Sequence, residues 1–301
     1  MTQLAGTRAV FAPLLVFSGA LFWGTAGPAS QFLYSTTATS PMAVAFLRLA
    51  LAAPLLLLFA MPALREHAGA LRNRASVLLT GGLCIALYQV FYFQAVAVSG
   101  VTLATLTALC PVPVLVAVLA RIILGERDAP VPWLGIILAS IGTLLLVGTP
   151  DTNAPTSELL LGAMLGLLAS LAFSGIALTG RALGHTIPPL AVTTTFFLVG
   201  ALALAPTILF IPQAVMATFD APWIVAFLVL FPTVIAYGLF YSGAGYTPAA
   251  ITGVLIVAEP LTASILGWAL LDERLASLQL AGAALLCAAM IRAALQQRNG
   301  T

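Results

Sequence analysis

The sequence predicts an all-α membrane protein with ten transmembrane helices, arranged as two inverted five-helix repeats. Three observations lead to this prediction. The chain is 61% hydrophobic and only 7% charged, it contains ten apolar runs, and its second half repeats part of its first half. Soluble proteins carry roughly 25% charged residues. A chain of 301 residues still has a large surface to cover, so this composition is suited to lipid and not to water.

The ten expected spans are separated by clusters of charged residues, proline and glycine. A helix needs about 20 apolar residues to cross a bilayer. By this rule the spans are 10–34, 41–62, 75–98, 101–124, 130–148, 159–180, 188–212, 222–244, 248–271 and 276–296. The first run is longer than the core of a signal peptide, so we interpret it as a retained span. The links at Ser99–Gly100 and 245–247 are so short that the helices on either side of each must be antiparallel neighbours.

The arginines predict the orientation in the membrane. Lysine is absent, and an N-terminus in the cytoplasm leaves only Arg274 in an outer loop. Arg48 lies inside a span, and the cytoplasmic segments then hold Arg8, Arg65, Arg72, Arg74, Arg121, Arg127, Arg181, Arg292 and Arg298. Basic residues accumulate in cytoplasmic loops. We therefore expect both termini in the cytoplasm and a multi-pass protein of the cell membrane.

An internal repeat relates residues 88–142 to residues 235–289 without a gap, at a constant offset of 147. Matched pairs are Phe93 and Phe240, Pro113 and Pro260, Leu124 and Leu271, and Gly135 and Gly282. We therefore expect two domains, 1–150 and 151–301. Because five is an odd number of spans, the second domain must enter the membrane in the opposite orientation. Inverted repeats are typical of secondary transporters, whose substrate sites lie near the bilayer midplane.

Four stretches resemble the drug/metabolite transporter superfamily, specifically its ten-span type with two EamA-like repeats. They are ALFWGTAG, PMAVAFLRLALAAPLLL, LGERDAPVPWLGIILASIGTLLL and LDERLASLQLAGAALLCAAM. The resemblance covers essentially the whole chain. It implies that spans 1–4 and 6–9 surround a central cavity, with spans 5 and 10 outside it. In aromatic content the chain is similar to bacterial exporters of amino acids and of aromatic or cationic compounds.

Glu259 is the acidic residue of the otherwise apolar stretch VLIVAEPLTA. It lies eleven residues past Pro248, about 16 Å along a helix and hence near the bilayer centre. Its counterpart in the first half is Val112, whereas the following proline is shared by both halves. We expect Pro113 and Pro260 to bend their helices.

Acids inside a membrane are costly and usually functional. Removal from water favours the neutral acid over the carboxylate unless a cation compensates. Three roles for Glu259 therefore remain open: it binds a substrate ammonium group, it carries a coupling proton, or it is a structural acid at the kink or paired with Arg48.

Arg48 lies seven residues past Pro41, about 10 Å into its helix from the outer end. A guanidinium group suits a substrate carboxylate. It is equally able to lock two helices together by donating to backbone carbonyls. Because the residue resembles a common position in a superfamily with differing substrates, the locking role is favoured.

Aromatic residues predict a pocket. Tyr88 and Tyr92 stand four residues apart, as do Tyr237 and Tyr241, so each pair shares a helical face. Phenol hydroxyls would be unsatisfied in lipid, so they should point inward. Rings in such a pocket stack on aromatic groups or hold a cation. The predicted substrate-binding residues are Trp23, Tyr88, Gln89, Tyr92, Phe93, Phe173, Tyr237, Tyr241 and Glu259. For any single ring, packing between helices is the alternative.

Other polar and small residues carry weaker expectations. Gln94 should lie near the same depth as the pocket. Close helix packing or local bending is expected at seven glycines, namely Gly24, Gly27, Gly162, Gly166, Gly238, Gly243 and Gly245.

Several functions lack the residues that they would need. The spans contain no histidine and no HExxH or GxSxG motif, so we expect no enzyme. The cysteines are isolated in apolar runs, and no phosphate-binding loop occurs, so we expect no metal, cofactor, nucleic acid or ATP-binding domain.

The sequence thus predicts a secondary transporter of small metabolites in the lipid bilayer. It would export amino acids, aromatic or neutral, by alternating access around a central cavity. An exporter of drugs or aromatic organic cations is the alternative. Proton coupling and facilitated diffusion both remain open, as does the oligomeric state.

Overall fold

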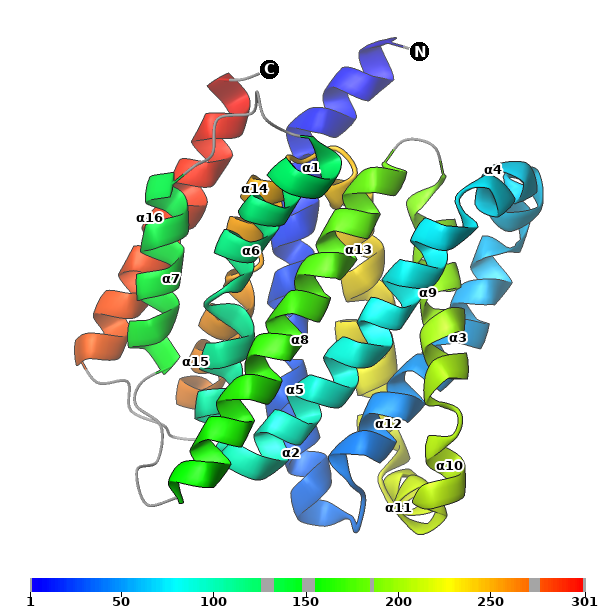
Figure 1. Ribbon diagram of the computed structural model, residues 1–301, viewed down its shortest axis with the longest axis vertical. Helices are drawn as coiled ribbons and strands as arrows, with labels where there is room; N and C mark the ends of the chain where they lie inside the picture. The colour runs from blue at the N-terminus through cyan, green and yellow to red at the C-terminus, as the bar shows by residue number, and fades with distance from the viewer. Residues whose placement is uncertain (1, 126–132, 148–154, 185–186, 271–276, 300–301) are drawn as a thin grey trace.

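The computed structural model describes residues 2–125, 133–147, 155–184, 187–270 and 277–299, which form helices joined by short turns (Figure 1). Over these ranges the chain contains no strand. Among the described residues, seven helical stretches are long and apolar enough to cross a membrane, and three shorter apolar helices accompany them. The chain is therefore an all-helical, multi-pass membrane protein.

The helices follow the chain order of the predicted spans. The first half contains α1 (Thr2–Trp23), α2 (Ala26–Thr36), α3 (Pro41–Glu66), α4 (Ala68–Asn73), α5 (Ala75–Leu109), α6 (Val112–Leu119), the π-helix η1 (Ala120–Leu124) and α7 (Trp133–Val147). The second half contains α8 (Thr156–Leu183), α9 (Pro189–Leu204), α10 (Thr207–Phe210), α11 (Pro212–Ala217), the 3₁₀-helix η2 (Thr218–Asp220), α12 (Pro222–Val229), the π-helix η3 (Leu230–Ile235), α13 (Ala236–Ala244), α14 (Ala249–Leu255), α15 (Ala258–Leu270) and α16 (Ser277–Asn299).

Turns interrupt the helices of four predicted spans, namely 10–34, 101–124, 188–212 and 248–271. The span 10–34 is divided into α1 and α2 at Gly24–Thr25, where the Thr25 hydroxyl donates to the Phe22 carbonyl at 2.7 Å and competes with the helical ladder. The span 188–212 is divided between α9 and α10 beside Pro206, whose missing amide hydrogen interrupts the ladder.

The chain reverses direction inside α5. The hydroxyl groups of Tyr92 and Thr105 lie 3.3 Å apart, although a straight helix would separate residues thirteen apart by about 20 Å. The helix α8 also contacts α5 before and after the reversal, because Gly162 lies against Ser99 and Gly166 lies against Thr107. The predicted reversal near Ser99–Gly100 is therefore confirmed. Gly162 and Gly166 permit the close packing expected of them, since a side chain at either would collide with α5.

The two halves run in opposite directions through the bundle. In Figure 1, α6 leads toward the end of the bundle where α1 begins, whereas α15 leads toward the opposite end. At the outer edge, α7 and α16 lie side by side, and a Cβ on Gly142 would lie 2.9 Å from the Gly282 carbonyl oxygen. Gly282 is the repeat counterpart of Gly135, and Gly142 is the counterpart of the fully buried Ala289. Gly142 and Gly282 are therefore not counterparts of each other, and their contact joins different positions of the two repeats.

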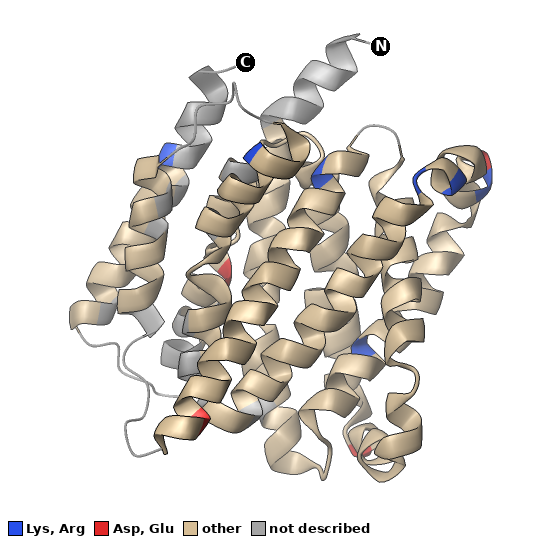
Figure 2. Ribbon diagram, viewed as in Figure 1, with Lys and Arg blue, Asp and Glu red and all other residues tan. Residues whose placement is uncertain are grey.

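Charged and apolar side chains are distributed as in a membrane protein. Basic residues gather at the end of the bundle where α1 begins and α16 ends (Figure 2). Large apolar side chains such as Leu58, Phe59 and Ile122 lie exposed on the outside of the bundle, where lipid would cover them. The interior is aromatic, and Phe173, Phe196 and Phe240 are among the largest fully buried side chains.

Candidate functional site

A cavity of about 50 Å³ lies inside the bundle, between the two halves of the chain. Its lining residues come from α1, α2, α3, α5, α8, α13 and α15. They are Trp23, Ala26, Gly27, Ser30, Arg48, Tyr88, Gln89, Tyr92, Phe93, Phe173, Tyr237 and Glu259. The structure thus brings together every predicted substrate-binding residue except Tyr241, together with Arg48, for which the sequence left a substrate role and a structural role open.

Broken helices lead to this cavity from both halves. One break separates α1 from α2 directly after Trp23. Another, at Ile256–Val257, separates α14 from α15 directly before Glu259. Because Pro260 has no amide hydrogen, it cannot serve the Ile256 carbonyl, which instead accepts from the Glu259 amide at 3.0 Å.

The repeat-equivalent proline also follows an interruption. A turn at Cys110–Pro111 separates α5 from α6, just before Pro113. The Pro113 side chain lies outside the described residues. Both halves therefore interrupt the helix close to the shared proline.

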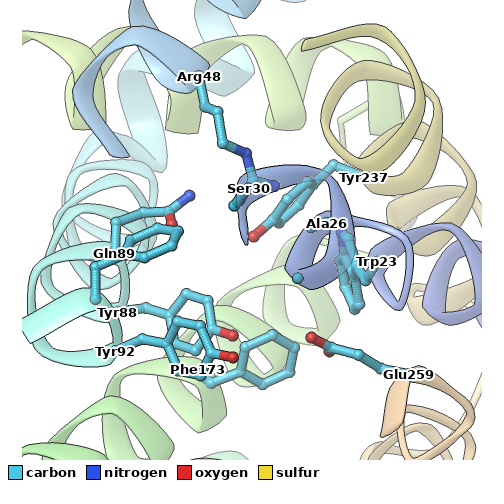
Figure 3. A pocket seen from close by; sticks show the side chains of 12 residues that line it. Trp23, Ala26, Ser30, Arg48, Tyr88, Gln89, Tyr92, Phe173, Tyr237 and Glu259 are labelled. Carbon is cyan, nitrogen blue, oxygen red and sulfur yellow. The ribbon is translucent and has the colours of Figure 1, made fainter. Parts of the chain in front are cut away.

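Glu259 and Arg48 lie on opposite sides of the cavity (Figure 3). Glu259 is half-buried, and its carboxyl group turns toward Phe173 and the hydroxyl ends of Tyr88 and Tyr92. Arg48 makes its hydrogen bonds to Thr233 and Pro232 and none to Glu259. The pairing of the two charges that the sequence left open is not formed in this structure.

Arg48 connects α3 to the π-helical segment η3. Its Nε donates to Thr233 Oγ1 at 3.1 Å, and its Nη2 donates to the Pro232 carbonyl oxygen at 3.3 Å. The Thr233 hydroxyl in turn donates to the Leu228 carbonyl at 2.6 Å. Pro232 has no amide hydrogen to donate to the Leu228 carbonyl, and the Thr233 hydroxyl serves that carbonyl instead. These bonds are of the kind that the helix-locking alternative for Arg48 requires.

Trp23 is the centre of an aromatic cluster that joins the two halves. Its ring centroid lies 4.8 Å from that of Tyr237, 4.9 Å from that of Phe240 and 5.5 Å from that of Phe173. Phe173 also meets Tyr88 edge-on, at 5.1 Å. Edge-to-face contacts of this kind are favourable beyond their buried area. The rings form one continuous wall across the boundary between the repeats.

Two residues expected at this depth lie elsewhere. Tyr241 packs against Phe196, with centroids 5.4 Å apart, and over Gly180. Gln94 is exposed and lines a separate groove of about 510 Å³ with Pro41 and Pro206. Tyr237 and Tyr241 share a helical face in sequence, but only Tyr237 reaches the cavity.

The structure adds three cavity residues that the sequence did not indicate: Ala26, Gly27 and Ser30, all in the first turns of α2. Of the two roles expected for Gly27 and Gly238, close packing is not found, because a Cβ at either position would have no neighbour within 4 Å. At Gly27 the unfilled space belongs to the cavity. The sequence feature that could have indicated these residues is Gly24, because the first span breaks there and α2 begins beside the cavity.

Comparison with known proteins agrees with this architecture. Residues 10–148 and residues 160–293 match the model of the EamA-like transporter family. The uncharacterised transporter YwfM of Bacillus subtilis (strain 168) is 30% identical over 263 residues, which cover 84% of this chain and 83% of the relative. An uncharacterised transporter of Archaeoglobus fulgidus is 26% identical over 250 residues, or 82% of this chain and 85% of the relative.

A solved crystal structure of a protein shares the fold. Its TM-score is 0.79 at 22% sequence identity, over 95% of this chain and 98% of that one. At this identity the likeness establishes the fold alone. The two family matches together span most of the sequence, and the chain belongs to the EamA-like transporter family of the drug/metabolite transporter superfamily.

Proposed function

We propose that this transporter exports amino acids, aromatic or neutral, by alternating access around the cavity between its halves. One observation carries the proposal: the same cavity has a guanidinium group on one side, a carboxyl group on the other and aromatic rings between them. An amino acid presents the complementary carboxylate and ammonium groups.

The membrane arrangement forms part of the proposal. Residues 1–150 and 151–301 act as two inverted five-helix units in the cell membrane, with ten spans and both termini in the cytoplasm. The two family matches, the opposite directions of α6 and α15, and the gathering of basic residues at one end of the bundle support it.

The size of the cavity supports alternating access. One water molecule occupies roughly 10–15 Å³ by the same measure, so a cavity of about 50 Å³ has room for only a few. An amino acid with an aromatic side chain enters only if the surrounding helices move apart. The breaks after Trp23 and before Glu259 offer points at which the half-helices move without disturbing the rest of the bundle.

An exporter of aromatic organic cations is the second candidate. It is favoured by Glu259 and by the rings of Trp23, Phe173 and Tyr88 around the same space. A carboxyl group beside aromatic faces attracts a cation through its charge and through the ring quadrupoles. Such a substrate would leave Arg48 in a purely structural role.

The test is uptake into proteoliposomes of a labelled amino-acid panel and of labelled tetraphenylphosphonium, with and without an imposed pH gradient. Wild type is compared with Glu259→Gln and with Glu158→Gln, an exposed acid at the start of α8 that serves as the control. Uptake of at least one amino acid supports the proposal. Uptake of tetraphenylphosphonium alone assigns the protein to the second candidate.

The Glu259→Gln variant separates the roles of the carboxyl group. Loss of gradient-driven uptake with downhill exchange retained identifies a proton carrier. Loss of all transport in folded protein identifies a substrate contact or an essential structural hydrogen bond. Unchanged transport removes Glu259 from the mechanism.

A further inference from the structure

Three side chains that line the cavity each carry a buried polar atom with no hydrogen-bond partner in the protein. These atoms are Trp23 Nε1, Ser30 Oγ and Gln89 Nε2. The three residues are 4%, 3% and 1% exposed, respectively. The indole and amide nitrogens only donate, and a hydroxyl group is able to do so. Buried donors without partners are costly, so this arrangement calls for a ligand that supplies acceptor oxygens.

The donors lie beside a positive charge. Figure 3 shows the amide nitrogen of Gln89 turned toward Ser30 and Arg48. The Arg48 guanidinium lines the cavity while its Nε and Nη2 are held by Thr233 and Pro232. Its position is therefore set by the protein before any ligand arrives, which reduces the entropic cost of binding.

The break in the first span adds a second source of positive electrostatic potential beside Arg48. The eleven-residue helix α2 begins at Ala26, and both Ala26 and Gly27 line the cavity. The first turn of a helix has amide hydrogens without intrahelical acceptors and carries a positive partial charge. Half-helix N-termini in transporters receive anionic substrate groups in this way. No side chain fills the space at Gly27, so a ligand has access to this end of α2.

We propose that Ser30, Gln89, Arg48 and the start of α2 form a carboxylate subsite, and that Glu259 across the cavity is the matching ammonium subsite. The protein accordingly selects zwitterions and rejects organic cations that lack a carboxylate. This inference rests on the proposed function, because it divides the same cavity. A zwitterion has no net charge, yet it gives each of the two opposed membrane-buried charges a partner.

The experiment uses the wild-type protein in proteoliposomes and the labelled amino acid with the highest uptake. Its methyl ester, which lacks the carboxylate, and its N-acetyl derivative, which lacks the ammonium group, are added as competitors. We expect the unlabelled free amino acid to inhibit uptake and each derivative to require at least tenfold higher concentrations. Repeating the assay with methanesulfonate, which has no carboxylate, in place of chloride tests whether an inorganic anion occupies the carboxylate subsite instead.

Two variants each remove one of these donors. Ser30→Ala and Gln89→Leu should each raise the half-saturating concentration about tenfold, because each deletes a hydrogen bond to a charged group. The control is Thr252→Val in α14, since the Thr252 hydroxyl is equally buried and unpartnered but does not line the cavity. It should leave uptake unchanged.

The outcomes separate the two proposals. If the methyl ester inhibits uptake as strongly as the free amino acid does, the zwitterion assignment is overturned and the proposed function stands. The same holds if both variants leave the half-saturating concentration unchanged. Competition by chloride at the site of the free amino acid assigns the subsite to an inorganic anion and also overturns it. Absence of uptake of every amino acid by the wild type overturns the proposed function and this inference with it.

Discussion

Arg48 in the first half of the chain donates through Nη2 to the Pro232 carbonyl oxygen in the second half, 3.3 Å away. Its Nε donates to the Thr233 hydroxyl, which is bonded in turn to the Leu228 carbonyl. A buried arginine thus fastens α3 to the π-helical segment η3 beside the cavity. The bonds compensate the charge where the ladder of the second-half helix is already interrupted.

Replacing Thr233 by valine should lower the free energy of unfolding by about 1 kcal/mol, because Arg48 Nε loses its acceptor in a buried site. Thermal unfolding in detergent measures the change. Thr252→Val is the control, since the Thr252 hydroxyl has no partner to lose. Equal effects of the two substitutions would show that the bond to Arg48 contributes nothing to stability.

Tyr92→Phe and Thr105→Val should each destabilise the protein by about 0.5–1 kcal/mol. Each removes the hydrogen bond between the two hydroxyl groups, which joins the segments of α5 on either side of its reversal. The double variant should be no less stable than the worse single variant. A double-mutant cycle from thermal unfolding measures this coupling. Strictly additive losses would mean that the two hydroxyl groups do not interact.

Gly243→Ala should be markedly destabilising, by about 1–3 kcal/mol, because its Cβ would overlap the main-chain oxygen of Ala12 on α1. Gly238→Ala on the same helix meets nothing within 4 Å. It should be neutral or stabilising by up to about 1 kcal/mol, because alanine favours the helix over glycine. Melting temperatures of the two variants test the contact between α1 and α13, and a reversed order of stability would refute it.

Tyr241→Phe should leave the half-saturating substrate concentration unchanged and keep or improve stability, because its buried hydroxyl has no partner and lies outside the cavity. Tyr237→Phe should raise that concentration severalfold, because the Tyr237 hydroxyl points into the cavity (Figure 3). Transport kinetics of the two variants measure the difference. A larger effect at Tyr241 would relocate the site toward Phe196.

The aromatic part of the site could be predicted because it follows from local rules. A membrane places polar tips inward, so Tyr88, Tyr92 and Tyr237 could be assigned to the interior from spacing alone. Tyr241 satisfied the same rule and lies outside the cavity, because rotation and packing of α13 against α9 decide which turn faces the space. Side-chain chemistry limits a residue to the interior but does not say which neighbours it meets there.

The sequence by itself determined the membrane class, the order of the helices, the reversal after Ser99 and the internal repeat. Hydropathy, segment length and turn residues act locally, so each of these features can be predicted from one segment of the sequence at a time.

Only the tertiary structure decided what the charges face. Ser30 and Gly27 have no distinctive signature, and they reach the cavity because the first span breaks at Gly24 and α2 starts beside it. The partner of Arg48 is the carbonyl of Pro232, more than 180 residues away in the sequence, and the packing of α3 against η3 brings the two together. Contacts between distant segments depend on how whole helices pack, and the free energy of that packing belongs to no single stretch of sequence.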